Sequence, residues 1–171
     1  MKRLVIIGAG GYGTMVKDVA SQLGIYEKIV FLDDNKTGED VAGKCGEYEK
    51  FIDENTDIYP AFGNNEKRLS LVDELISLGA NVPVIIHPKA YVSKTAEIGK
   101  GTVILPLAAV NTGCVINRAC IINTSAIIDH GTVIGKGTHV CLGAIVKAEN
   151  KIPPLVKIQA GEVIEDRTYP L

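Results

Sequence analysis

Two of the chain's three histidines, His130 and His139, lie close together in the stretch IIDHGTVIGKGTHV. A neutral imidazole can take a proton as a general base near pH 7, and it is also a common metal ligand. A catalytic zinc site needs three protein ligands besides water, and the third histidine, His87, is far away in the sequence. The residue types therefore favour proton transfer over metal catalysis, with two solvated surface histidines as the alternative.

Both histidines fall in a repeat with a period of six residues. From Ile86 to Ile164, the first residue of each of fourteen consecutive hexads is isoleucine or valine. In the first ten hexads a small residue, such as Ala90 or Ala126, stands four positions later. Branched residues favour an extended backbone, so the period predicts a short strand and a turn in every hexad. Three hexads would close one triangular coil, with the branched side chains stacked inside it.

The repeat also predicts where the two histidines point. His130 is the third residue of its hexad, and His139 is the last residue of the next one. Neither takes the branched position that faces the interior. We therefore expect both side chains on the outside of the coils, free to act on a substrate.

The N-terminal residues do not follow the period of six. A short apolar strand, RLVIIG, leads into the glycine turn GAGGYG, after which we expect a helix, TMVKDVASQLG, and a second strand, EKIVFLDD. Glycines at the start of a helix let a phosphate approach the backbone N–H groups, where the helix dipole favours negative charge. Asp33 stands where a dinucleotide-binding protein keeps the acid that holds a ribose, which taken alone predicts NAD.

The rest of the N-terminal part limits the size of the ligand. After a loop-rich stretch we expect a strand, DIYPAFG, a helix from near Asn64–Asn65 to Leu78, and a strand, NVPVII. About eighty residues make half of a dinucleotide fold, with room for a mononucleotide. The GNN turn would lie beside the glycine turn, at the edge of the sheet where such folds bind ligands. The chain is thus predicted to have two domains, residues 1–84 and residues 85–171.

Several motifs together resemble one known family. They are GAGGYG, FLDD with Lys36 just beyond it, FGNNEKR, IIHP and INTSAIIDHGTVIGKGTHV. With the hexapeptide repeat of left-handed parallel β-helices, this combination resembles the sugar acetyltransferases of the NeuD/PglD type, which modify sialic acids or nucleotide-linked amino sugars. The resemblance covers nearly the whole chain. It implies a small Rossmann-like α/β domain that binds the nucleotide sugar, followed by a left-handed parallel β-helix acyltransferase domain.

The resemblance also implies an activity and a set of site residues. The chain would be an acetyl-CoA-dependent N- or O-acetyltransferase that works as a cytoplasmic homotrimer, without a metal. His130 would be the general base and Asn123 would lie near the reacting centre, while His139 and Gly143 would lie beside the acetyl donor. The nucleotide contacts would be Gly8, Gly10, Gly11, Tyr12, Gly13, Asp33, Asp34, Lys36 and Asn64.

Three departures from the family pattern bear on these expectations. Relatives often have histidine where this chain has Tyr12, and they commonly have an acid where it has Gly131, with Asp129 on the other side of the base. The chain also ends at Leu171, whereas relatives usually continue for a further coil that helps to hold CoA. The alternative is therefore a trimer with a shortened β-helix that binds a nucleotide sugar, or activates a partner, without catalysis.

Composition narrows the classes of partner. The formal net charge of -2 provides no basic surface for nucleic acid, and no apolar run approaches the length of a membrane span. The four cysteines show no CxxC spacing and no secretory signal is recognisable, so we expect reduced thiols in the cytoplasm. Neither nucleic acid nor a membrane is an expected partner.

Overall fold

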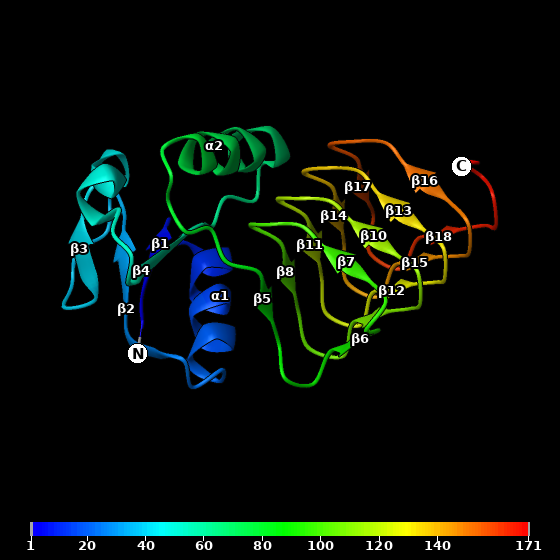
Figure 1. Cartoon of the computed structure of the whole chain (residues 1–171), viewed down its shortest axis with the longest axis horizontal. Coiled ribbons are helices and arrows are strands. Elements are labelled where there is room, and N and C mark those ends of the chain that lie inside the picture. The colour runs from blue at the N-terminus through cyan, green and yellow to red at the C-terminus, as the bar shows by residue number, and fades with distance from the viewer. Residues whose placement is uncertain (1, 171) are drawn as a thin grey trace. The chain divides into compact units, whose positions relative to one another are not determined.

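Two compact units make up the chain. The computed structural model describes residues 2–170, and the boundary between the units lies between Pro83 and Val84. The N-terminal unit holds one four-stranded sheet with its helices, and the C-terminal unit holds the short strands β5 to β18 (Figure 1).

The N-terminal unit is a parallel sheet covered by helices. Its elements in chain order are β1 (Lys2–Ile7), α1 (Gly11–Ser21), β2 (Tyr26–Leu32), β3 (Val41–Gly43), the 3-10 helix η1 (Cys45–Phe51), β4 (Thr56–Pro60) and α2 (Asn65–Ser77). The strands pair in parallel in the order β3-β2-β1-β4. The four consecutive residues from Leu4 to Ile7 in β1 are fully buried, although they point alternately to the two faces. The sheet is therefore covered on both faces, as in other α/β folds.

Three segments of this unit differ from what the sequence predicted. Helix α1 begins at Gly11, inside the glycine turn, rather than after it. The strand predicted for NVPVII does not form: Asn81 makes a single bridge to Asp57, and Ile85–Ile86 belongs to the other unit. Pro83 lacks the N–H that a continuous strand would donate, which accounts for the break. The stretch predicted to be loop-rich contains β3 and η1.

The C-terminal unit is a parallel β-helix of two-residue strands. Each strand ends on the branched residue of its hexad, so the period found in the sequence positions every strand. The strands are β5 (Ile85–Ile86), β6 (Tyr91–Val92), β7 (Glu97–Ile98), β8 (Val103–Ile104), β9 (Ala109–Val110), β10 (Val115–Ile116), β11 (Ile121–Ile122), β12 (Ile127–Ile128), β13 (Val133–Ile134), β14 (His139–Val140), β15 (Ile145–Val146), β16 (Lys151–Ile152), β17 (Lys157–Ile158) and β18 (Val163–Ile164).

Three parallel sheets form the walls of this β-helix. Their orders are β17-β14-β11-β8-β5, β18-β15-β12-β9-β6 and β16-β13-β10-β7, and we name them the β5 sheet, the β6 sheet and the β7 sheet. Every third strand along the chain therefore pairs, so three hexads close one coil. The predicted fold class, a Rossmann-like α/β domain followed by a left-handed parallel β-helix, is confirmed.

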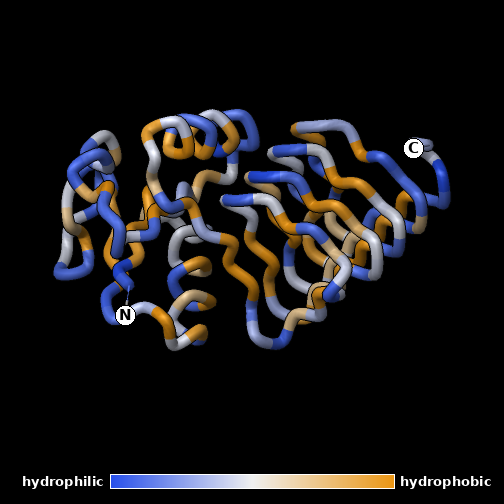
Figure 2. Tube along the Cα trace, in the orientation of Figure 1, coloured by the Kyte–Doolittle hydropathy of each residue, from blue (hydrophilic) through white to orange (hydrophobic). Residues whose placement is uncertain are grey.

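Branched side chains fill the interior of the coils. Ile104, Val110, Ile116 and Ile122 are at most 1% exposed, and they form one cluster with small residues such as Ala126. Hydrophobic stretches alternate with hydrophilic ones along every coil (Figure 2). The residue before each branched residue points outward, because successive residues of a strand face opposite sides.

The corners of the coils use a left-handed backbone conformation. From Gly101 to Arg167, the fourth residue of every hexad has a φ between 53° and 70°. Six of these residues are glycine, which adopts this conformation without strain. Gly131, which directly follows His130, is one of them, with a φ of 64°. The other six are Leu107, Ala119, Ser125, Glu149, Leu155 and Arg167.

Candidate functional site

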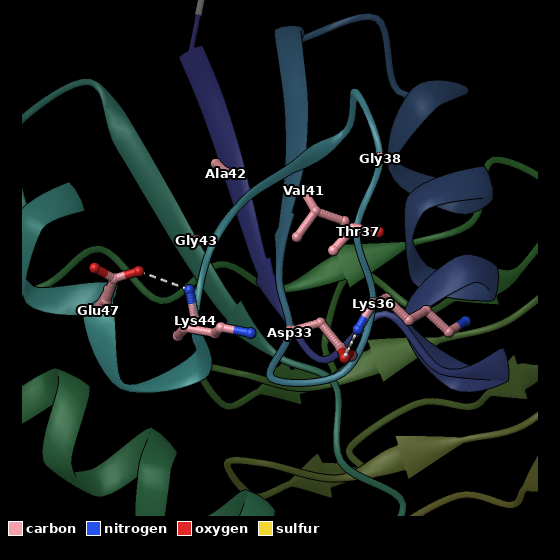
Figure 3. A pocket seen from close by; sticks show the side chains of 9 residues that line it. All are labelled: Asp33, Lys36, Thr37, Gly38, Val41, Ala42, Gly43, Lys44 and Glu47. Atoms are coloured by element: carbon pink, nitrogen blue, oxygen red, sulfur yellow. Dashed lines mark hydrogen bonds between the residues drawn. The ribbon is translucent and has the colours of Figure 1, made fainter.

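A cavity of about 410 Å³ opens beside β2 and β3 in the N-terminal unit. It lies where the chain leaves the carboxyl end of β2, the edge at which open α/β sheets bind ligands. The side chains around it come from the loop after β2, from β3 and from η1 (Figure 3). The lining residues are Asp33, Lys36, Thr37, Gly38, Val41, Ala42, Gly43, Lys44 and Glu47.

The Asp33 carboxylate ties the glycine turn to the wall of this cavity. Its Oδ2 accepts a hydrogen bond from the N–H of Ala9 at 2.8 Å, and its Oδ1 accepts from the N–H groups of Asn35 and Lys36 at 2.9 Å. The bond from Ala9, followed by the other two, lowers the pKa of Asp33 below its usual value. The Asp33 carboxylate therefore stabilises the glycine turn and the loop after β2, a role that requires no ribose.

Two lysines and two acids shape the rest of the cavity wall. The Lys36 ammonium donates to the carbonyl oxygen of Ala9, and the Lys44 ammonium donates to the carbonyl oxygen of Asp34 at 2.7 Å. Glu47 accepts from the N–H of Lys44 at 2.7 Å, a bond drawn in Figure 3. The Asp34 side chain accepts from the N–H that begins η1 at 3.0 Å, so it supports the wall without lining the cavity.

Close backbone approach shapes the glycine turn itself. A Cβ on Gly13 would lie 2.0 Å from the carbonyl oxygen of Gly8, so only glycine fits there. A Cβ on Gly10 or Gly11 would meet no atom within 4 Å, so this part of the turn borders open space. Gly10 is the N-cap of α1 and offers no side-chain oxygen to the first N–H groups of the helix. Those donors suit an anion.

Two residues that were predicted to contact the nucleotide form hydrogen bonds with other residues of the unit. The Tyr12 hydroxyl lies 2.7 Å from the Tyr59 hydroxyl, with the two rings edge to face. Asn64 is the N-cap of α2, and its side-chain oxygen accepts from the N–H of Lys67 at 2.9 Å. Neither residue lines the cavity. Their contacts with a nucleotide stay predictions.

Sequence reasoning missed Arg68, a fully buried cation near the same edge of the sheet. Its guanidinium donates to the carbonyl oxygen of Phe62 at 2.9 Å and to the side-chain oxygen of Asn65 at 2.8 Å, so it braces the FGNN turn from within. Helical spacing could have indicated that Arg68 is buried, because it shares a buried face of α2 with Val72 and Leu75.

His130 lies on an exposed turn of the β-helix, directly after β12. Asp129 does not bond its ring: the Asp129 carboxylate accepts from the backbone N–H of His130 at 2.7 Å and from Asn111 Nδ2 at 3.1 Å. These two bonds, the first being the stronger influence, lower the pKa of Asp129. Asp129 thus fixes the turn that carries His130, and the imidazole faces outward as predicted.

Asn123 and His139 form a second group of predicted site residues. Asn123 follows β11 and is largely buried, and its Nδ2 lies 3.1 Å from Nε2 of the half-buried His139 in β14. Gly143 adjoins this group, because its N–H donates to the carbonyl oxygen of Thr124 at 3.0 Å. Asn123 and His130 stand on the turns before and after β12, so they lie at opposite ends of the central strand of the β6 sheet.

Neither a metal centre nor a membrane span is found among residues 2–170. In this range no three His, Cys, Asp or Glu side chains are grouped to hold a metal ion, and no helix is long and apolar enough to cross a bilayer. The four cysteines of the chain are free thiols.

Comparison with known proteins begins with the N-terminal unit. Residues 3–75 match the family model of the PglD N-terminal domain. UDP-N-acetylbacillosamine N-acetyltransferase of Bacillus subtilis (strain 168) is 33% identical over 112 residues, which are 61% of this chain and 52% of that protein. The chain therefore spans about half the length of this curated relative.

Solved structures match the chain over nearly its whole length. The acetyltransferase domain of PglB from Neisseria gonorrhoeae FA1090 is 35% identical with a TM-score of 0.94, and the match covers 98% of this chain and 84% of that one. The same domain, solved in complex with acetyl coenzyme A, also matches with 35% identity and a TM-score of 0.94, over 97% of this chain and 83% of that one.

A more distant structure has the same fold. PerB from Caulobacter crescentus is 21% identical with a TM-score of 0.80, over 100% of this chain and 92% of its own. The order of a Rossmann-like unit and a β-helix is thus common to all three solved structures. Motifs, fold and an identity of 35% along nearly the whole length agree, and the chain belongs to the NeuD/PglD type of sugar acetyltransferases.

Proposed function

We propose that this protein is an acetyl-CoA-dependent N- or O-acetyltransferase whose acceptor is a nucleotide-linked amino sugar or a sialic acid. The observation that carries the proposal is the 35% identity, over 98% of the chain, with an acetyltransferase domain that has also been solved with acetyl coenzyme A. The Bacillus subtilis relative, named for its UDP-linked amino sugar, supports the same class of acceptor.

The N-terminal unit is the proposed site for the nucleotide. A cavity of about 410 Å³ is in the range typical of small-molecule sites, roughly 300 to 1,000 Å³. The uncapped start of α1 suits a phosphate, and Lys36 and Lys44 add positive charge nearby. We assign the diphosphate to the glycine turn and the nucleoside to the cavity, with Asp33 and Asp34 holding the walls in place.

The β-helix is the proposed site of acetyl transfer. His130 takes a proton from the sugar amine or hydroxyl as that nitrogen or oxygen attacks the thioester carbonyl of acetyl-CoA. The C–S bond then breaks, the acetyl group stays on the sugar, and CoA leaves as a thiolate that receives the proton from His130. His139 and Gly143 are proposed to lie beside the acetyl donor, with Asn123 near the reacting centre.

A homotrimer is the proposed assembly. The outward residues of the β6 sheet, which pair in register, are all apolar, and they are Tyr91, Ala109, Ile127, Ile145 and Val163. Three of them, Tyr91, Ile127 and Val163, are 60%, 38% and 45% exposed. Copies meeting along this sheet would bring His130 of one copy towards Asn123 and His139 of another, which lie at the opposite end of the strands. The protein is proposed to be cytoplasmic, in line with its free thiols.

A thiol-release assay tests the proposal. Acetyl-CoA is supplied with a panel of UDP- and GDP-linked amino sugars, and free CoA thiol is measured for the wild type and for His130→Ala. We expect turnover with at least one sugar in the wild type and a loss of about 10²-fold or more in the variant. Nucleotide-sugar affinity, measured by calorimetry, should be nearly unchanged in the variant.

Two outcomes would overturn parts of this proposal. Full activity of His130→Ala would remove His130 from the role of base. Absence of turnover with every sugar, together with absence of CoA binding by calorimetry, would favour the alternative of a non-catalytic trimer that binds a nucleotide sugar or activates a partner.

A further inference from the structure

The hydrogen bonds of Asn123 define which way its side-chain amide points. The main-chain N–H of Thr124 donates to Asn123 Oδ1 at 2.8 Å. Because an N–H can only donate, the atom it reaches must be the amide oxygen. The amide nitrogen therefore faces Nε2 of His139, at 3.1 Å. The main chain of Asn123 is anchored as well, since its N–H donates to Val140 and its carbonyl oxygen accepts from Ala126.

This orientation determines which ring nitrogen of His139 carries the proton. An amide NH₂ carries two donors and no acceptor, so Nε2 of His139 must accept the hydrogen bond. Nε2 then holds no proton, and a neutral ring carries its proton on Nδ1. A doubly protonated ring would place an N–H against the amide N–H, so the contact with Asn123 opposes the imidazolium form.

The neighbouring strands also favour a neutral ring. His139 occupies the outward position of β14, where it pairs with Ile121 of β11 on one side and Lys157 of β17 on the other. Side chains directly opposite each other on paired strands lie close together. Lys157 therefore sets a positive charge opposite His139, which weighs against a second positive charge on the ring.

We propose that Asn123 is a positioning residue that holds His139 as the neutral tautomer with its proton on Nδ1. The functional meaning of this inference rests on the proposed acetyl transfer. While Nε2 is bonded to Asn123, it is not available to take a proton from a sugar, so His139 does not share the base role with His130 through that nitrogen. The donor of the ring is Nδ1–H, a group of the kind that stabilises negative charge on a carbonyl oxygen.

Long-range ¹H–¹⁵N correlation spectra of the full-length protein, labelled with ¹⁵N-histidine, test the tautomer. The chain has three histidines, so His130→Gln and His139→Gln are enough to assign all the ring signals. The spectra are recorded at about pH 7.5, which is one unit above the usual histidine pKa. Under these conditions we expect His139 of the wild type to show an unprotonated Nε2 and a protonated Nδ1. Free neutral histidine favours the reverse. A protonated Nε2, or an average of the two tautomers, would overturn the proposal without any substitution at Asn123.

Substitutions then test whether Asn123 is the cause. In Asn123→Asp, a carboxylate accepts where the amide donated, so Nε2 of His139 should become protonated. Asn117→Ala is the matched control, because Asn117 is also the second residue of its hexad and its Nδ2 bonds the carbonyl oxygen of Ile134. The control should leave the His139 signals unchanged. Unchanged signals in a folded Asn123→Asp would show that Asn123 does not set the tautomer.

Kinetics separate this inference from the proposed function. If the wild type transfers acetyl groups, Asn123→Asp should lower kcat by about 10²-fold, the typical cost of losing one donor to a developing oxyanion, and should change the pH profile of kcat. A variant with the altered tautomer but with wild-type kcat and pH profile would refute the positioning role. If the wild type has no activity, the spectra still decide the tautomer, so the two failures are distinguishable.

Discussion

Gly13 lies so close to Gly8 that the glycine turn admits no side chain there. In Gly13→Ala the new Cβ would lie 2.0 Å from the carbonyl oxygen and 3.0 Å from the carbonyl carbon of Gly8, both of which are backbone atoms. We expect a loss of about 2 to 3 kcal/mol in the free energy of unfolding, measured by urea denaturation. Gly10→Ala is the control, since its Cβ meets nothing within 4 Å. Equal stability of the two variants would contradict the prediction.

The Asp33 carboxylate should make stability depend on pH in acid. Its folded pKa is below the usual 3.8, chiefly through the hydrogen bond from Ala9, so its contribution is present above pH 3.8 and is lost as pH falls through the folded pKa. Asp33→Asn should therefore destabilise the protein at pH 7, and the difference from wild type should shrink below about pH 4. Urea denaturation at several pH values measures this difference. A gap that stays constant down to pH 2 would show that the charge is not responsible.

Residue types alone indicated part of the site and missed the rest for identifiable reasons. The outward direction of His130 follows from its place in the hexad. The bond between Asn123 and His139 was not predicted, although stacking the coils would have placed His139 beside Ile121, two residues before Asn123. The sequence also did not show that three backbone N–H groups converge on the Asp33 carboxylate, whose contact with the nucleotide stays a prediction.

Elements of the β-helix depend on two kinds of glycine. Gly161 has a φ of 70° and open space around its Cβ position, so Gly161→Ala adds backbone strain alone, about 1 kcal/mol. Gly99 has no positive φ, but a Cβ there would lie 2.4 Å from the backbone nitrogen of Arg118. Gly99→Ala should therefore cost more, about 2 to 3 kcal/mol. Thermal unfolding compares the two, and a larger loss in Gly161→Ala would contradict the order.

The period of six predicted every strand of the β-helix because one residue type repeats at the inward position and nothing interrupts it. The N-terminal unit was less predictable, since β3 and η1 are short and owe their form to contacts across the sheet. Thus the N–H of Phe31 in β2 bonds Asp40 just before β3, and Glu47 accepts the N–H that precedes η1. Such partners are distant in sequence or carry no periodic signal, so local patterns did not indicate them.

For the whole molecule, the apolar outward residues of the β6 sheet bear on the proposed trimer. A sheet that faces water usually alternates apolar residues inside with polar residues outside, and this one is apolar on both sides. Its outer face lies between the turns that carry Asn123 and His130. If the face is where copies meet, each active site needs two chains, and loss of the trimer should abolish transfer even though every site residue is intact.

Ile127→Glu tests this connection. Ile127 is the central outward residue of the β6 sheet, and burying a carboxylate at an apolar interface without a partner is costly enough to separate the copies. We expect light scattering to give the mass of three chains for the wild type and of one chain for the variant, with acetyl transfer lost and nucleotide-sugar binding kept. Val115→Glu, at the outward position of β10 in the β7 sheet, should stay trimeric and active. A trimeric Ile127→Glu would place the interface elsewhere, whereas an active monomer would show that one chain holds a complete site.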